Sequence, residues 1–143
     1  KSNELMKKEQ SLLEIQKLKI EIGNQAEKTV VEYEKLKLLK ANKSKLAKLV
    51  NLNPSKNPMA GYDIDSFDKN GKNIKIEVKA INGNRFIITR QEIKKANQLD
   101  EYYLYLVNMG RVEKPQIKII YKPKFDQNLM FNLIPINYEA KFK

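Results

Sequence analysis

Apolar and polar side chains alternate in two neighbouring stretches of the chain, residues 62–67 and residues 74–79. A repeat of two residues is typical of half-buried β-strands, because successive side chains point to opposite faces of the sheet. The intervening Asp68-Lys69-Asn70-Gly71 fits a three-residue hairpin loop, with a type I turn on Lys69-Asn70 and Gly71 in the left-handed region. The pattern therefore predicts an antiparallel β-hairpin.

The predicted loop determines which residues of the two strands face each other. It pairs Asp68 with Lys72, and counting outward from that pair places Asp63 directly opposite Glu77. Opposed residues on one face of a hairpin have Cβ atoms about 5 Å apart, and like charges there are destabilising. A hard divalent cation between the two carboxylates would relieve the repulsion. Lys79, two residues beyond Glu77, is expected on the same face of the strand.

A second interpretation of these charges requires no cation. Lys75 and Lys79 would neutralise the acids of the hairpin on a solvated sheet face, as ordinary cross-strand ion pairs do. The spacing of the residues leaves both interpretations open. The acids concerned are Asp63, Asp65 and Glu77.

The N-terminal part of the chain is predicted to be helical. From Asn3 to Lys40 there is no Pro, a single Gly at Gly23, and good helix formers throughout. We expect one long helix, or two helices that meet at Gly23. The part before Gly23 has a thin apolar stripe interrupted by charges, which fits either a solvated linking helix or a coiled-coil or partner-binding helix. We therefore divide the chain into a helical linker, residues 1–22, and a domain, residues 23–143.

From Ile22 onward the apolar stripe of this helix is better formed. Apolar residues recur at intervals of three and four, which predicts a face that packs on a sheet. Glu27 borders this stripe, and two interpretations apply to it: a surface acid, or an acid that points into the interior near the hairpin acids. The stripe consists of Ile22, Ala26, Val30 or Thr29, Tyr33 and Leu36.

The segments on either side of the hairpin are predicted as follows. Residues 45–52 alternate imperfectly and are expected to form a first strand, and residues 53–58, with two prolines, form a loop. Residues 85–88 are expected to be a short strand or extended segment. Thr89-Arg90-Gln91-Glu92 is a capping box, so a helix should begin there and extend to about Gln98.

Two apolar runs follow this second helix. Residues 101–108 are almost continuously apolar, as in a strand buried on both faces, and residues 116–121 form another strand. Residues 125–143 are expected to be irregular or to form edge structure. The order helix, three strands, helix, two strands predicts an α/β fold with a mixed sheet flanked by helices.

The net charge of +11 suits a polyanionic partner such as nucleic acid. The alternative is a compositional bias, since Lys, Asn and Ile are all plentiful. The predicted second helix has an N-terminus suited to phosphate, and basic side chains near it could follow a nucleic-acid backbone. The candidates for DNA binding are Arg85, Arg90 and Lys94.

The chain contains no His and no Cys. Ser-His-Asp and Cys-His catalysis and His-ligated zinc sites are therefore excluded within it. Hydrolysis by carboxylate-bound Mg²⁺ or Mn²⁺ with a Lys as helper remains possible, and the hairpin could supply those groups. The absence of Cys, of a secretory signal and of a long apolar run leads us to expect a cytoplasmic protein with no membrane segment. Because the sequence starts at Lys1 rather than Met, we expect an excised domain or a processed fragment.

Asp63, followed by Glu77-Val78-Lys79 on the next strand, resembles the PD-(D/E)xK nuclease superfamily. A larger set of residues resembles the protein NO VEIN C-terminal-like domain family, whose members are often attached to helicase or restriction-type ATPase proteins. This resemblance covers about Gly23 to Pro123. It is carried by Gly23, Ala26-Glu27, Val30, Tyr33-Glu34, Gly61-Tyr62-Asp63-Ile64, Glu77-Val78-Lys79, Phe86, Ile88-Thr89, Glu92, Tyr103-Leu104-Tyr105 and Pro115.

The resemblance implies a restriction-endonuclease-like fold and a metal-dependent endodeoxyribonuclease of a restriction or antiviral defence protein. Asp63, Glu77 and the Val78 carbonyl would bind Mg²⁺ or Mn²⁺, Lys79 would orient or help to deprotonate the attacking water, and Glu27 would complete the site. DNA is the implied substrate. A helicase or ATPase domain in the same or a partner chain is implied as a partner, and a second copy is expected because restriction cuts two strands.

Two positions depart from the superfamily pattern. Tyr62 stands in place of Pro, which this family shares, and Ala80 stands where Thr is common, so a polar backbone contact is in doubt. Some members of the superfamily bind DNA without cutting it, so the fold alone does not establish activity. The rival functions are a non-catalytic DNA-binding module on the same fold, and an interaction domain that holds partners with the N-terminal helix.

Overall fold

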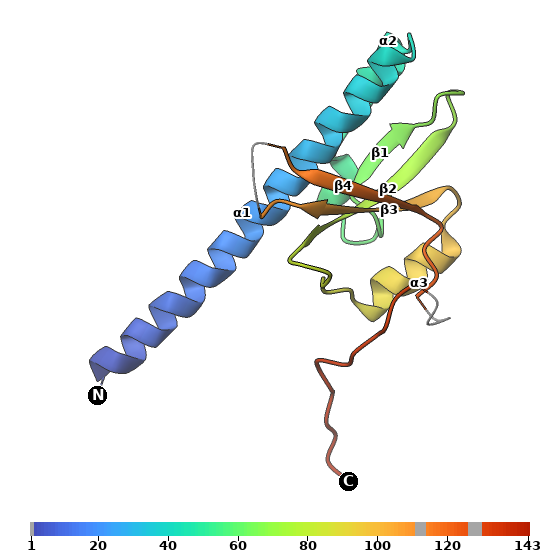
Figure 1. Cartoon of the computed structure of the whole chain (residues 1–143). Helices are drawn as coiled ribbons and strands as arrows, with labels where there is room; N and C mark the ends of the chain where they lie inside the picture. Colours follow the sequence, from blue (N-terminus) through green and yellow to red (C-terminus); the bar gives the residue numbers. More distant parts are fainter. Residues whose placement is uncertain (1, 111–113, 126–129) are drawn as a thin grey trace.

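The computed structural model describes residues 2–110, 114–125 and 130–143. Four strands form one mixed sheet in the order β1-β2-β3-β4, with the long helix α1 on one face and α3 on the other (Figure 1). The predicted α/β architecture is confirmed. Its elements are α1 (Ser2–Lys40), α2 (Ser44–Ala47), the 3₁₀ helix η1 (Asn53–Lys56), β1 (Ile64–Phe67), β2 (Asn73–Ile81), α3 (Arg90–Gln98), β3 (Tyr102–Asn108) and β4 (Gln116–Tyr121).

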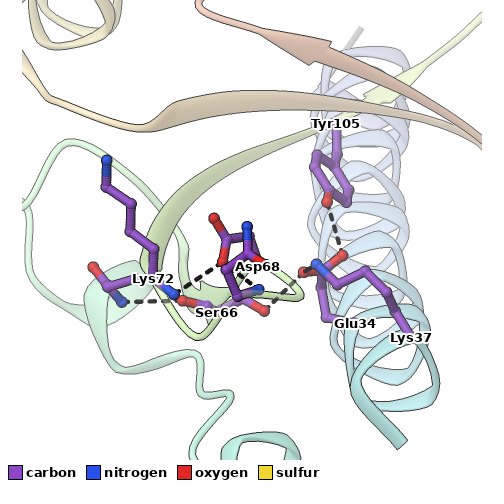
Figure 2. Close-up of polar contacts among 8 residues, drawn as sticks. Glu34, Lys37, Ser66, Asp68, Lys72 and Tyr105 are labelled. Carbon is purple, nitrogen blue, oxygen red and sulfur yellow. Dashed lines mark hydrogen bonds and ion pairs between the residues drawn. The ribbon is translucent and has the colours of Figure 1, made fainter. Parts of the chain in front are cut away.

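The β1-β2 hairpin has the predicted register. Ile64 pairs with Ile76, and at the turn the Asp68 N–H donates to the Lys72 carbonyl at 2.8 Å. The Asp68 carboxylate in turn accepts the Lys72 N–H at 2.9 Å (Figure 2). Gly71 has φ +88, a left-handed conformation that glycine adopts without strain. Local turn chemistry therefore sets the pairing of the two strands, as the sequence predicted.

The two central strands divide the interior into two cores. β2 pairs with β3 in parallel, and α3 forms the connection between them, while β3 and β4 are antiparallel. Successive β2 residues point alternately to α1 and to α3, so Ile74, Ile76 and Val78 belong to the α1 core. The α3 core contains Ala96, Tyr102, Leu104, Leu106, Ile120 and Phe125.

Helix α1 runs unbroken through Gly23, so the prediction of one long helix is confirmed. Residues 2–21 are exposed and project beyond the sheet (Figure 1). In the described residues, no helix has the length and apolarity needed to cross a membrane.

The buried stripe of α1 differs from the predicted one. Tyr33 and Leu36, expected to face the sheet, are 40% and 56% exposed. The buried positions instead follow a spacing of four residues, which moves the stripe slowly around the helix. The prediction missed this spacing because one of the four positions holds an acid: the residues are Ala26, Val30, Glu34 and Leu38.

Glu34 is a fully buried acid that connects α1 to the sheet (Figure 2). The Ser66 hydroxyl of β1 and the Tyr105 hydroxyl of β3 each donate to its carboxylate at 2.7 Å. Lys37, one turn further along α1, forms an ion pair with the same carboxylate. These partners satisfy the buried charge, so the cluster joins one helix and two strands through polar contacts.

The strand predicted over residues 45–52 is wrong. The segment forms the short helix α2 and a turn, and Asn51 makes only an isolated bridge to Asp65. Ala47 and Val50 are three apart and both enter the α1 core, whereas Leu49, one of the residues that suggested a strand, is 56% exposed. Their spacing is that of a helical turn rather than of a strand.

The other expected elements are present. The Thr89 capping box begins α3, which ends at Gln98, and the strands predicted over residues 101–108 and 116–121 are β3 and β4. Of residues 85–88, Arg85 forms a bridge to Asn82, and the rest are extended without strand pairing. Residues 130–143 form neither helix nor strand, as expected, and residues 126–129 lie outside the described residues.

Replacing Glu34 with Ala should lower the free energy of unfolding by about 3 kcal/mol, because two buried hydroxyls lose their acceptor. Urea denaturation followed by circular dichroism measures this change. Glu32→Ala, on the exposed side of α1, is the matched control and should stay within about 0.5 kcal/mol of the unsubstituted chain. Equal stability of both variants would show that the Glu34 cluster contributes nothing to the docking of α1.

Candidate active site

The predicted site lies on the α3 face of the sheet, where β1 begins beside the middle of β2. The register of the hairpin brings Asp63, which immediately precedes β1, opposite Glu77. The Asp63 N–H donates to the Ile76 carbonyl at 2.9 Å, and its carboxylate accepts the Val78 N–H at 2.8 Å. The two carboxyl groups are close enough for each to shift the pKa of the other. The sequence therefore predicted correctly that these two acids face each other.

Lys79 extends from β2 toward the same acids. Its Nζ lies 3.6 Å from a Glu77 oxygen and 2.9 Å from both carboxylate oxygens of Glu92 on α3. The Lys79 and Glu92 side chains are 18% and 26% exposed, so the ammonium group is partly shielded but can be reached from solvent. The expected proximity of Lys79 to Glu77 is therefore present.

Glu92 is the member of this cluster that the sequence analysis did not assign to the site. Its side chain accepts the Thr89 N–H at 2.9 Å, and its own N–H donates to the Thr89 hydroxyl at 3.1 Å. The same carboxylate accepts hydrogen bonds from the Lys79 ammonium through both of its oxygens. The capping box was identified, but it was taken to account for the whole role of this acid. One feature could have indicated that Glu92 lies near the site. A helix that connects two parallel strands must cross the face of the sheet, and this brings α3 close to β2.

Burial strongly raises the pKa of Glu77. Desolvation is the main cause, the negative charge of Asp63 adds to it, and a hydrogen bond shared with Glu92 contributes, so the pKa rises from 4.5 to about 10. Burial also raises the pKa of Asp63, although the Val78 N–H and Lys79 oppose that shift. At neutral pH Glu77 therefore retains a proton between its two acidic neighbours.

The pKa of Glu92 is lowered, whereas that of Glu77 is raised. Burial would raise its pKa, but hydrogen bonds from Glu77, Lys79 and the Thr89 N–H outweigh it and lower the pKa to about 2. Glu92 is therefore ionised at neutral pH and is the acid that balances the Lys79 ammonium.

Glu27 lies on α1, next to Ala26 of the core on the opposite face of the sheet from α3. It is half-buried, and its pKa is raised to about 7, first by burial and then by the negative charge of Asp63. That Glu27 points toward the hairpin acids stays a prediction.

The carboxyl groups of the cluster are of the chemical type that a hard divalent cation takes as ligands. If the carboxyl groups of Asp63, Glu77 and Glu92 are all ionised beside the Lys79 ammonium, three negative charges and one positive charge leave an excess of two negative charges. Carboxylate and carbonyl oxygens are the ligands that Mg²⁺ and Mn²⁺ prefer. Within residues 2–110, 114–125 and 130–143, no three acidic, His or Cys side chains converge on a single point as metal ligands. The donors that the family resemblance implies are two carboxylates and a carbonyl, from Asp63, Glu77 and Val78.

The three predicted DNA-binding residues are exposed near the start of α3. Arg85 lies in the loop after β2, Arg90 is the first residue of α3, and Lys94 is one turn further along the helix. They lie on the same side of the sheet as the helix that supplies Glu92.

A family model described as Protein NO VEIN, C-terminal, matches residues 26–120, which is more than half of the chain. The matched range contains all the acids of the cluster and Lys79. Comparisons with curated proteins and with solved structures found no match.

Glu77→Gln should stabilise the metal-free chain at about pH 8. Between pH 4.5 and about 10 the folded chain retains the Glu77 proton that the unfolded chain has released. The free energy of unfolding therefore falls as the pH rises through this window, by at most about 1.4 kcal/mol per pH unit. Gln has no such proton, so the variant should be at least about 1 kcal/mol more stable at pH 8 and lose most of the slope between about pH 7 and pH 9.

Urea denaturation at a series of pH values, with a chelator present, measures this difference. Glu21→Gln removes an acid from the exposed part of α1 and should keep the slope of the unsubstituted chain. An unchanged slope in Glu77→Gln would mean that Glu77 is ionised in the folded chain.

Proposed function

The chain belongs to the Protein NO VEIN C-terminal family, and on this premise we propose that it is a metal-dependent endodeoxyribonuclease domain that hydrolyses DNA phosphodiester bonds. One observation carries the proposal: Asp63 and Glu77 face each other across the hairpin, with the Lys79 ammonium 3.6 Å from Glu77. Proteins rarely bury like-charged acids together without a functional reason, and strongly perturbed carboxyl groups cluster at active sites.

In the proposed mechanism, Asp63, Glu77 and the Val78 carbonyl would hold Mg²⁺ or Mn²⁺. The cation would lower the pKa of an attacking water and offset the charge that develops on the phosphate. Glu77 must release the proton that it retains at neutral pH before its carboxylate can act as a ligand. Lys79 orients the water and adds positive charge beside the reacting phosphate. Glu27 lies at the α1 side of the site and adds a further acid near Asp63.

The net charge of +11 supports DNA as the substrate, since a polyanion gains affinity from each phosphate that is neutralised. Arg85, Arg90 and Lys94 are the residues proposed to contact its backbone. We place the domain in a cytoplasmic restriction or antiviral defence protein, with a helicase or ATPase domain in the same or a partner chain. A second copy would provide the second active site needed to cut both strands.

The alternative function is a non-catalytic DNA-binding module on the same fold. The observation that favours it is the pairing of Lys79 with Glu92, together with the proton on Glu77. These interactions already offset much of the negative charge of the acids, so the chain can fold without a cation.

Plasmid cleavage separates the two functions. With Mg²⁺ or Mn²⁺ the unsubstituted chain should nick supercoiled DNA, and Glu77→Ala and Lys79→Ala should each reduce the rate at least about 100-fold. Gel electrophoresis of the plasmid measures the rate. Glu77→Ala should bind DNA about as well as the unsubstituted chain, because the protonated Glu77 carries no charge toward the phosphate at neutral pH.

Glu21→Ala, on the exposed part of α1, is the matched control and should cleave normally. Salt-dependent DNA binding without nicking would support the non-catalytic module. Equal nicking by all four proteins would attribute the activity to contamination, and no salt-dependent affinity for DNA would contradict both functions.

A further inference from the structure

The Lys79 ammonium occupies a defined position because of one neighbour. A lysine side chain has four rotatable bonds, and ordering it is entropically unfavourable unless its ammonium group finds partners. Glu77 is 3.6 Å away, which is too long for a hydrogen bond. Both oxygens of Glu92 lie at 2.9 Å, so Glu92 provides the two close contacts.

The Glu92 carboxylate is itself fixed by its own helix. It accepts the Thr89 N–H at the start of α3, and α3 is anchored in the second core by Ile93, Ala96 and Leu99. The packing of α3 thus sets the position of the Glu92 carboxylate. This carboxylate in turn orients the flexible Lys79 side chain of β2.

We propose that Glu92 is a positioning residue of this site, whose carboxylate holds the Lys79 ammonium beside the Asp63-Glu77 acid pair. This inference rests on the proposed function, in which Lys79 assists the attacking water. Without the Glu92 charge, the nearest acids for the ammonium group are Glu77 and Asp63. Lys79 would then either pair with the proposed metal ligands or extend into solvent.

The capping role and the positioning role of Glu92 can be separated by substitution. Gln at this position also serves a capping box, so Glu92→Gln keeps the acceptor for the Thr89 N–H and removes only the charge that binds Lys79. Thr89→Ala does the reverse, because it removes the hydroxyl that accepts the Glu92 N–H and leaves the carboxylate in place.

The first readout needs neither metal nor DNA. Acetylation with an N-hydroxysuccinimide ester, followed by peptide mass spectrometry, gives the rate at Lys79 relative to the exposed Lys69. Glu92→Gln should raise this relative rate about threefold or more, as expected for the loss of a partly exposed ion pair. Thr89→Ala should lower the melting temperature and change the Lys79 rate less.

The second readout is the rate of plasmid nicking with Mg²⁺, which Glu92→Gln should lower by about tenfold or more. If the unsubstituted chain does not nick DNA, the proposed function fails, while the acetylation rates still report whether Glu92 holds Lys79. An unchanged Lys79 rate in Glu92→Gln would overturn the inference. Equal effects of Glu92→Gln and Thr89→Ala on both readouts would overturn it as well, since the cap alone would then be responsible.

Discussion

The burial of two acids opposite each other on the β1-β2 hairpin is the constraint on which the rest of the site depends. The turn at Asp68 sets the register, and the register places Asp63 against Glu77. Their repulsion is relieved by a proton on Glu77 and by the Lys79 ammonium. That ammonium requires an acid of its own, which the start of α3 supplies. The position of α3 is thus linked to the charge balance of the acids on the β1-β2 hairpin.

The chain contains a second buried acid with a different role. The Glu34 carboxylate accepts hydrogen bonds from two hydroxyl groups and forms an ion pair with Lys37. Every buried polar atom of that cluster therefore has a partner. Among the described residues, the hydrogen-bond and ion-pair partners of Glu34 are two hydroxyl groups and one lysine. Glu77 instead lies beside Asp63 and Glu92, and its pKa is raised to about 10, so added positive charge would favour its ionisation. The contrast between the two environments distinguishes an acid that joins elements of the fold from an acid suited to bind a cation.

Local chemistry explains which features could be predicted from the sequence. The hairpin register follows from Asp68 and Gly71, and the start of α3 follows from its capping box, because these signals act within a few residues. The features that were missed depend on contacts distant in sequence. Glu34 is buried only because Ser66 and Tyr105 meet it from two strands, and the second role of Glu92 arises only when α3 lies over β2. The same holds for residues 45–52, whose apolar side chains enter the core as a short helix.

Helix α1 is continuous from the exposed residues 2–21 to the Glu34 cluster. This continuity affects how a force on the exposed part reaches the sheet. At 1.5 Å per residue, its exposed part is a stiff arm of about 30 Å. Because the arm has no hinge at Gly23 and is joined to β1 and β3 by polar contacts, a torque applied at its far end would turn the sheet as one body. The orientation of the acid cluster is therefore coupled to the direction in which this arm points.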